Sequence, residues 1–218
     1  MKIVVVLFDR LTALDAIGPY EVLQRLPGGD LVFAADEPGE KRTETGRLGL
    51  TADVALADVP EPDVIVVPGG FGTRAAADHE PTLEWLRHAH EHSTFTTSVC
   101  TGSLVLGAAG LLDGLEATTH WAELDALAAY GARPTQRRVV DQGRIITAAG
   151  VSSGIDMALT VVAKLAGDDM AKAIQLGIEY DPQPPFDAGS VAKAGPELTE
   201  MVRAALDAEN EHTAALDR

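Results

Sequence analysis

The residue best placed to do chemistry in this sequence is Cys100, the single cysteine among 218 residues. Residues 94–99 are rich in Thr, Val and Phe and predict a short buried strand, whereas residues 102–112 are rich in Ala, Leu and Gly and predict a packed helix. Ser98 and Gly102 are both small, as a sharp strand-to-helix turn requires, and this spacing is typical of a nucleophile elbow with Cys in the place of Ser. At the first turn of a helix the macrodipole favours the thiolate, so we expect Cys100 to be reactive rather than a small buried hydrophobe.

Two further segments are predicted to meet Cys100 at one edge of a parallel sheet, because each directly follows a core strand. Asp15 follows the first strand, and its carboxyl group is placed to exchange a proton with a reacting substrate; the alternative is a silent carboxylate near a helix start. Gly69 and Gly70 follow a later strand. They are either a simple turn or, with the Thr101 amide, a set of N–H groups that bind developing negative charge. No Gly-Lys-Ser/Thr sequence follows them, which excludes a phosphate loop.

Three histidines are candidates for a functional role. His120 is the natural candidate for a base beside the thiol or for a substrate contact, and the alternative is a structural histidine in the core or at its rim. His88 and His92 share a predicted helix face at four-residue spacing, which suits a metal ion. The sequence offers them no evident third ligand, so we expect a solvated face and no metal site.

Composition limits the classes of function. The length is most simply that of one domain. Acidic residues number 33 and basic residues 17, and the net charge of −16 argues against nucleic acid and anionic membrane surfaces as partners. A single cysteine excludes an internal disulfide and a multi-cysteine zinc site, which fits a reducing cytoplasm. The apolar run at residues 3–8 is too short for a signal peptide or a membrane span.

Strand and helix patterns alternate along the chain, which predicts an α/β fold with a doubly wound, mostly parallel sheet and helices on both faces. The predicted core strands are residues 3–8, 31–35, 63–67 and 94–99, with hairpins within residues 37–51 and 138–148. Pro19 suggests that the first regular helix starts near Gly18 within the segment 12–26. Further helices are predicted at residues 81–92, 102–112, 122–130, 154–165, 168–180 and 196–216, with an irregular stretch at residues 180–190.

The motifs together resemble the DJ-1/PfpI superfamily and, within it, the isocyanide hydratase branch. The most specific match is residues 97–112 (TSVCTGSLVLGAAGLL) followed by residues 117–121 (ATTHW). Shorter pieces agree across nearly the whole length: Leu14-Asp15 with Gly18-Pro19, Pro68-Gly69-Gly70, Gly154-Ile155-Asp156, Gln175-Leu176 and Glu179-Tyr180.

This resemblance implies a flavodoxin-like domain over residues 1–190 with residues 191–218 as its C-terminal helical extension, a homodimer and no cofactor. It implies that Cys100 is the nucleophile, that Asp15 hydrogen-bonds near it and that Thr101 contacts the reacting group. The implied activity is addition of water to an isocyanide, giving an N-substituted formamide through a cysteine thioimidate. The alternatives are a cysteine-based redox or ligand sensor and a glyoxalase-type protein. Thr101 stands where protease-like members carry His, and Asp15 where glyoxalase members usually carry Glu.

Overall fold

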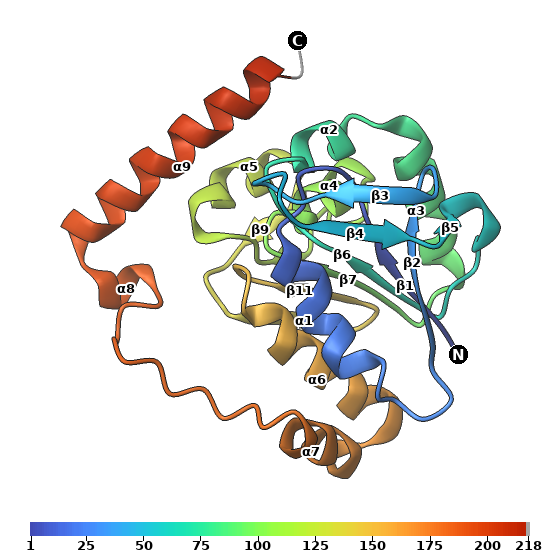
Figure 1. The fold of residues 1–218 in the computed structure, drawn as a ribbon. Coiled ribbons are helices and arrows are strands. Elements are labelled where there is room, and N and C mark those ends of the chain that lie inside the picture. The colour runs from blue at the N-terminus through green and yellow to red at the C-terminus, as the bar shows by residue number, and fades with distance from the viewer. Residues whose placement is uncertain (217–218) are drawn as a thin grey trace. The chain divides into compact units, whose positions relative to one another are not determined.

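The computed structural model describes residues 1–216, and the chain divides into two compact units, Met1–Ile178 and Glu179–Arg218. The first unit holds a central sheet with helices on both faces, so the predicted fold class is confirmed (Figure 1). The predicted domain boundary after residue 190 stays a prediction.

The central sheet has seven strands in the order β10-β11-β7-β6-β1-β2-β5. Every neighbouring pair is parallel except β10 with β11, which form the predicted hairpin. The chain passes from β1 to β2 on one side and later returns to β6 on the other, so the direction of winding reverses between β1 and β6. Ligand sites of such sheets lie at this reversal, outside the carboxyl ends of the strands. The strands are β1 (Lys2–Val6), β2 (Asp30–Ala35), β5 (Val54–Ala55), β6 (Val64–Val67), β7 (Phe95–Val99), β10 (Val139–Gln142) and β11 (Ile145–Ala148).

Continuous apolar strands are needed because both faces of the sheet are covered. In β1, Ile3 and Val5 pack into one core cluster and Val4 and Val6 into another, and all four are at most 2% exposed. The first cluster lies under α1 (Ala13–Leu23), α6 (Ser153–Ala166) and α7 (Asp168–Gly177). The second lies under α2 (Thr73–Ala77), α3 (Glu80–His92), α4 (Gly102–Ala108) and α5 (Leu124–Ala129).

Short elements complete the first unit. Two small sheets pair β3 (Gly39–Arg42) with β4 (Gly49–Ala52), as the predicted hairpin, and β8 (Glu116–Ala117) with β9 (Arg133–Pro134). Two 3-10 turns, η1 (Leu56–Asp58) and η2 (Trp121–Glu123), precede β6 and α5.

The prediction that the first regular helix starts near Gly18 is wrong, because α1 begins at Ala13 and runs through Pro19. Pro19 removes one hydrogen bond from the helix. Close packing on α6 holds the segment helical nonetheless: a Cβ at Gly18 would lie 3.2 Å from Ile155 Cγ1. The earlier start places Asp15 in the first helical turn.

The helix after Cys100 is shorter than predicted, since α4 ends at Ala108 rather than Leu112. Gly110 has φ +79°, and the Leu111 N–H donates to the Leu106 carbonyl at 3.0 Å. This left-handed glycine with a six-to-one hydrogen bond is a Schellman ending, which the Ala- and Leu-rich sequence concealed.

The second unit consists of an irregular stretch, α8 (Val191–Ala194) and α9 (Pro196–Leu216). The irregular stretch and the long final helix agree with the predictions for residues 180–190 and 196–216. Within residues 1–216, no helix combines the length and apolar character needed to cross a bilayer.

Candidate active site

Cys100 lies between β7 and α4 in a left-handed backbone conformation, with φ +57°. This conformation is strained for any residue with a Cβ, and such strain concentrates at functional sites. The Cys100 N–H donates to the carbonyls of Ala148 and Ala149 at 3.1 and 2.9 Å, which tie the turn to the end of β11. The predicted elbow is therefore present as a tight turn at the carboxyl edge of the sheet.

The small residue after the elbow is a steric requirement. A Cβ at Gly102 would lie 2.1 Å from the Val67 carbonyl oxygen and 2.7 Å from the Pro68 carbonyl oxygen. The start of α4 thus touches the backbone at the end of β6, as the elbow spacing predicts. Ser98, on the other side, is fully buried in β7.

The carboxyl group of Asp15 is fully buried beside the elbow. Its Oδ2 accepts a hydrogen bond from the Gly69 N–H at 2.9 Å, and Oδ1 has no partner with good hydrogen-bond geometry among the described residues. The pKa of Asp15 is raised from 3.8 to about 7, chiefly by burial. Donation from the Gly69 N–H lowers it, the negative charge of Glu44 raises it, and donation from the Cys100 thiol lowers it. A carboxyl group with this pKa both gives and takes protons near neutral pH.

The pKa of the Cys100 thiol is shifted in the direction opposite to the one that the sequence predicts. Cys100 is 5% exposed, and burial raises its pKa above the ordinary range, with the neighbouring Asp15 charge as the next cause. The backbone N–H groups of Val151 and Thr101 act in the opposite direction. The expectation that the first turn of the helix favours the thiolate over the thiol is therefore wrong, because α4 has only seven residues and desolvation is the larger effect.

Cys100 and Asp15, which we call the dyad, have to be considered together because each changes the pKa of the other. With one proton between them the pair carries one negative charge, either as thiol and carboxylate or as thiolate and carboxylic acid. Moving that proton changes the nucleophile and the acid in a single step without changing the net charge. The arrangement suits an addition in which sulfur and hydrogen join the same substrate.

Gly69 and Gly70 hold the two polar side chains of the site. A Cβ at Gly69 would lie 2.5 Å from the Thr101 nitrogen and 3.0 Å from Asp15 Oδ2, so no larger residue fits. The Gly69 N–H is bonded to Asp15, and the Gly70 N–H donates to Thr101 Oγ1 at 2.9 Å. Both amides thus position site residues, and the N–H groups that act on the sulfur come from Thr101 and Val151.

The Thr101 hydroxyl is held within a small network. Thr73 Oγ1 donates to the Gly70 carbonyl at 2.6 Å and lies 2.9 Å from Thr101 Oγ1. The Thr101 hydroxyl has two acceptors within reach, Thr73 Oγ1 and the Gly70 carbonyl at 3.3 Å. A substrate contact by this hydroxyl would exchange one of these bonds, and this role of Thr101 stays a prediction.

His120 caps η2 at the border of the site. Its Nδ1 accepts a hydrogen bond from the Ala122 N–H at 3.4 Å, and its ring lies 5.5 Å from the Trp121 ring. A Cβ at Gly150 would lie 2.9 Å from His120 Cδ2, so the ring packs against the residue before Val151. These contacts show a structural role for His120, and its part in catalysis or substrate binding stays a prediction.

Four residues that the sequence did not single out also shape the site. Thr119 Oγ1 donates to the Cys100 carbonyl at 3.0 Å, and Ser103 Oγ donates to the same carbonyl at 3.2 Å. Val151 has φ +30°, a rare value for a β-branched residue, and its N–H faces the thiol. Glu44 accepts from Thr12 Oγ1 at 2.6 Å and raises both pKa values of the dyad. No local sequence signal marks Val151 or Glu44.

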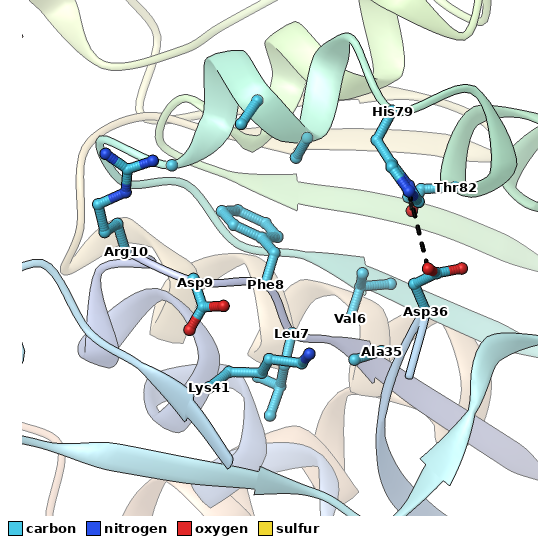
Figure 2. Close-up of a pocket in the computed structure, with 13 residues that line it drawn as sticks. Val6, Leu7, Phe8, Asp9, Arg10, Ala35, Asp36, Lys41, His79 and Thr82 are labelled. Carbon is cyan, nitrogen blue, oxygen red and sulfur yellow. Dashed lines mark hydrogen bonds and ion pairs between the residues drawn. The ribbon is translucent and has the colours of Figure 1, made fainter. Parts of the chain in front are cut away.

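A separate cavity of about 330 Å³ lies beyond the end of β1 (Figure 2). Asp36 and His79 face each other across it at 3.7 Å, and Asp9, Arg10 and Lys41 add further charges. Neither member of the dyad lines this cavity. We therefore assign the chemistry to the elbow and not to the cavity.

The model of the DJ-1/PfpI family matches residues 1–164. The chain belongs to the DJ-1/PfpI family. Isonitrile hydratase from Pseudomonas putida is 45% identical over 190 residues, which cover 87% of this chain and 83% of that protein. The HTH-type transcriptional regulator CdhR from Pseudomonas aeruginosa is 32% identical over 171 residues, which cover 75% of this chain and 49% of the regulator.

Solved structures of the DJ-1/PfpI family share the fold. A ThiJ/PfpI family protein from Pseudomonas syringae superposes with a TM-score of 0.92 at 36% identity, covering 99% of this chain and 89% of that one. DJ-1beta from Drosophila melanogaster gives 0.74 at 22% identity and agrees in fold alone. The family resemblance predicted from the elbow and the surrounding motifs is confirmed, including the likeness to the hydratase branch.

Proposed function

We propose that this DJ-1/PfpI protein is an isonitrile hydratase, which adds water to an isocyanide R–NC and releases an N-substituted formamide. The observation that carries the proposal is the buried dyad, in which a thiol and a carboxyl group with a pKa of about 7 share the elbow. The 45% identity to a protein named isonitrile hydratase supports the choice of substrate class.

In the first step Cys100 sulfur forms a bond to the terminal carbon of the isocyanide. Asp15 delivers the single proton of the dyad to that carbon. The terminal carbon thus gains both the sulfur and a hydrogen. The product is a thioimidate, R–N=CH–S–Cys, and Asp15 is left as a carboxylate. No charge is created overall, which suits a site where burial disfavours ions.

In the second step Asp15 acts as a base. It takes a proton from water as the water oxygen bonds to the thioimidate carbon, and it passes this proton to the imine nitrogen, which gives the tetrahedral intermediate R–NH–CH(OH)–S–Cys. Collapse of the tetrahedral intermediate breaks the C–S bond, releases R–NH–CHO and returns a proton to the dyad. The net reaction is R–NC plus water to the formamide, and the protein is regenerated.

The surrounding residues have supporting roles in this proposal. The Thr101 and Val151 N–H groups stabilise negative charge on sulfur as it attacks and again as it leaves. Gly69 and Gly70 hold Asp15 and Thr101, and His120 borders the substrate space. The nucleophile, the proton and water complete the reaction without a metal or an organic cofactor. We also propose a homodimer acting in the cytoplasm on a small molecule, without nucleic acid or membrane partners.

The test is incubation of the protein with a simple alkyl or aryl isocyanide while the formamide is followed by NMR. In D₂O we expect deuterium at the formyl carbon, because the dyad proton exchanges with solvent before it reaches carbon. Cys100→Ala is expected to abolish turnover while leaving the circular dichroism spectrum unchanged. Formamide production at the wild-type rate by Cys100→Ala would exclude the covalent route.

The competing functions predict different results. A sensor that uses the same cysteine would give no formamide. The similarity to the regulator CdhR, of which this chain spans about half, is the reason to test this function. A glyoxalase would produce lactate from methylglyoxal. Running both substrates with wild type and Cys100→Ala separates the three functions.

A further inference from the structure

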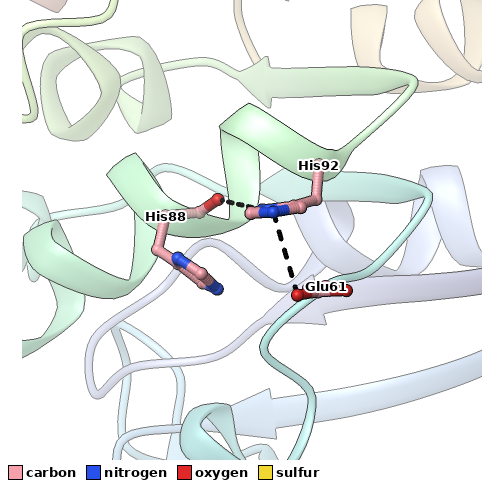
Figure 3. A group of neighbouring side chains, drawn as sticks. All are labelled: Glu61, His88 and His92. Carbon is pink, nitrogen blue, oxygen red and sulfur yellow. Dashed lines mark hydrogen bonds and ion pairs between the residues drawn. The ribbon is translucent and has the colours of Figure 1, made fainter.

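A second group of chemically capable side chains lies away from the dyad. His88 and His92 are on one face of α3, and Glu61 projects toward them from the segment before β6 (Figure 3). One ligand atom from each residue lies within 4.8 Å of the others. The sequence predicted the histidine pair without a third ligand, and the fold supplies it in Glu61, 27 residues before His88.

The hydrogen bonding of His92 fixes which ring nitrogen faces the group. His92 Nδ1 lies 3.0 Å from the His88 carbonyl oxygen. A carbonyl only accepts, so Nδ1 carries the proton and the neutral ring has its lone pair on Nε2. That lone pair faces Glu61 Oε1 at 3.8 Å. Metal-binding histidines are typically oriented in this way, by donation from the other ring nitrogen to a backbone carbonyl.

The two facing atoms are arranged as ligands of a cation. With His92 neutral, the Nε2 lone pair points at a carboxylate oxygen, and both atoms are acceptors. A cation bound between the two atoms resolves this conflict. The His88 ring lies beside that of His92, with 4.7 Å between the ring centres.

We propose that Glu61, His88 and His92 form a binding site for a divalent transition metal of the zinc class, unrelated to the thiol chemistry. Two imidazoles and one carboxylate are a common zinc ligand set, whereas calcium and magnesium prefer oxygen ligands. Ligand bonds of about 2.1 Å in a tetrahedron place donor atoms about 3.4 Å apart. The observed separations contract to this value by rotation of exposed side chains, and water takes the fourth position.

The place of the site in the fold indicates its role. Glu61 precedes β6 and therefore lies near the amino end of that strand, whereas the dyad is at the carboxyl edge of the same parallel sheet. A bound metal would connect the end of α3 to the segment entering β6. This role is stabilisation of the first unit and not catalysis.

The test is calorimetric titration of the untagged full-length protein with zinc chloride at pH 7.5. We expect one zinc per chain with a dissociation constant in the micromolar range, and a rise in the unfolding midpoint of about 5 °C at saturation. Glu61→Gln and His92→Gln are each expected to weaken binding by at least about thirtyfold. His212→Gln, which removes another exposed histidine, is the matched control and is expected to bind as wild type does.

Cobalt absorption separates this site from the thiol. Tetrahedral cobalt bound to nitrogen and oxygen gives visible bands that Cys100→Ser is expected to leave unchanged. Loss of the bands in Cys100→Ser would place the metal at the dyad and overturn the proposal. Equal zinc affinity in wild type, Glu61→Gln and His92→Gln, or a stoichiometry well below one, would overturn it as well.

Discussion

The dyad and the Glu61–His88–His92 cluster both gather titratable groups on one sheet, yet their environments are opposite. Asp15 is 0% exposed and Cys100 5%, whereas the side chains of His92 and Glu61 are 41% and 59% exposed. The dyad is built from the turn between β7 and α4 and from the first turn of α1, both held by backbone hydrogen bonds, whereas the cluster is built from a helix face and a segment with rotatable side chains.

The difference shows what burial contributes to a site. In the dyad, desolvation raises the pKa of both groups, so a proton stays with the pair and its position decides the chemistry. In the exposed cluster, water screens the charges, and the side chains are suited to binding a metal ion rather than to transferring a proton. Substitutions at the dyad should therefore change rates, and those at the cluster should change little unless a metal is present.

Replacing the nucleophile is expected to have the largest effect. Cys100→Ser keeps the size of the side chain and its hydrogen-bonding capacity but replaces a thiol with a far weaker nucleophile. We expect kcat/KM for isocyanide hydration to fall by about 10⁴-fold or more, because the covalent intermediate no longer forms. Steady-state kinetics measures this, and a fall below about tenfold would contradict the role of sulfur.

Asp15→Asn is expected to lower activity and, above neutral pH, to raise stability. The variant lacks the proton carrier, so kcat should fall by about 10²- to 10⁴-fold. Burial raises the folded pKa of Asp15 from 3.8 to about 7, so ionising this group costs stability as pH rises above 3.8, and the full cost applies above pH 7. Asn removes that cost.

Denaturant unfolding of wild type and Asp15→Asn checks the stability side. At pH 8 the variant should be more stable by about 2–4 kcal/mol, and at pH 4 the difference should vanish. A variant equally stable at both pH values would show that Asp15 is not desolvated. This gain with loss of function is the usual signature of a strained catalytic group.

The parts of this site that sequence could predict are those set by neighbouring residues or by topology. Cys100 and Gly102 define the elbow within three positions, and the carboxyl-edge rule brings Asp15 and Gly69 to it. The direction of the thiol pKa could not be predicted, because desolvation depends on how the whole core packs around the sulfur.

The missed residues act across long stretches of chain. Glu44 influences Asp15 from a hairpin 29 positions away, and Val151 reaches the thiol from a turn after β11. Glu61 comes close to His88 and His92 only because the fold brings the segment before β6 next to α3. Hydrophobic periodicity carries no information on such contacts. The helical start at Ala13 was missed because packing on α6 overrides the usual effect of Pro19.

A smaller effect is expected from Glu44→Gln, which keeps the size of the side chain and its bond to Thr12 but removes one charge near the dyad. The one-proton dyad forms as pH rises through the Asp15 pKa of about 7, so kcat/KM should rise over that range. Removing the Glu44 charge lowers the Asp15 pKa and should move this rise to lower pH. A pH profile of kcat/KM checks it, and a shift to higher pH would contradict it.

The smallest effect is expected from His88→Gln in metal-free buffer. The side chain lies on an exposed helix face, and we expect the free energy of unfolding to change by less than about 0.5 kcal/mol and hydration kinetics to stay as in wild type. Denaturant unfolding in the presence of a chelator measures this. A loss above about 2 kcal/mol would show that the cluster supports the fold without metal.

The two hydroxyls on the Cys100 carbonyl have a consequence on the other side of that peptide bond. In a planar trans unit the C=O and the following N–H point in opposite directions. Ser103 and Thr119, by anchoring the oxygen, therefore aim the Thr101 hydrogen at the sulfur. If the Cys100–Thr101 peptide plane were flipped, a lone pair of the carbonyl oxygen would face the sulfur and repel negative charge on it. Ser103 and Thr119 thus decide, through one peptide unit, the polarity that the sulfur meets.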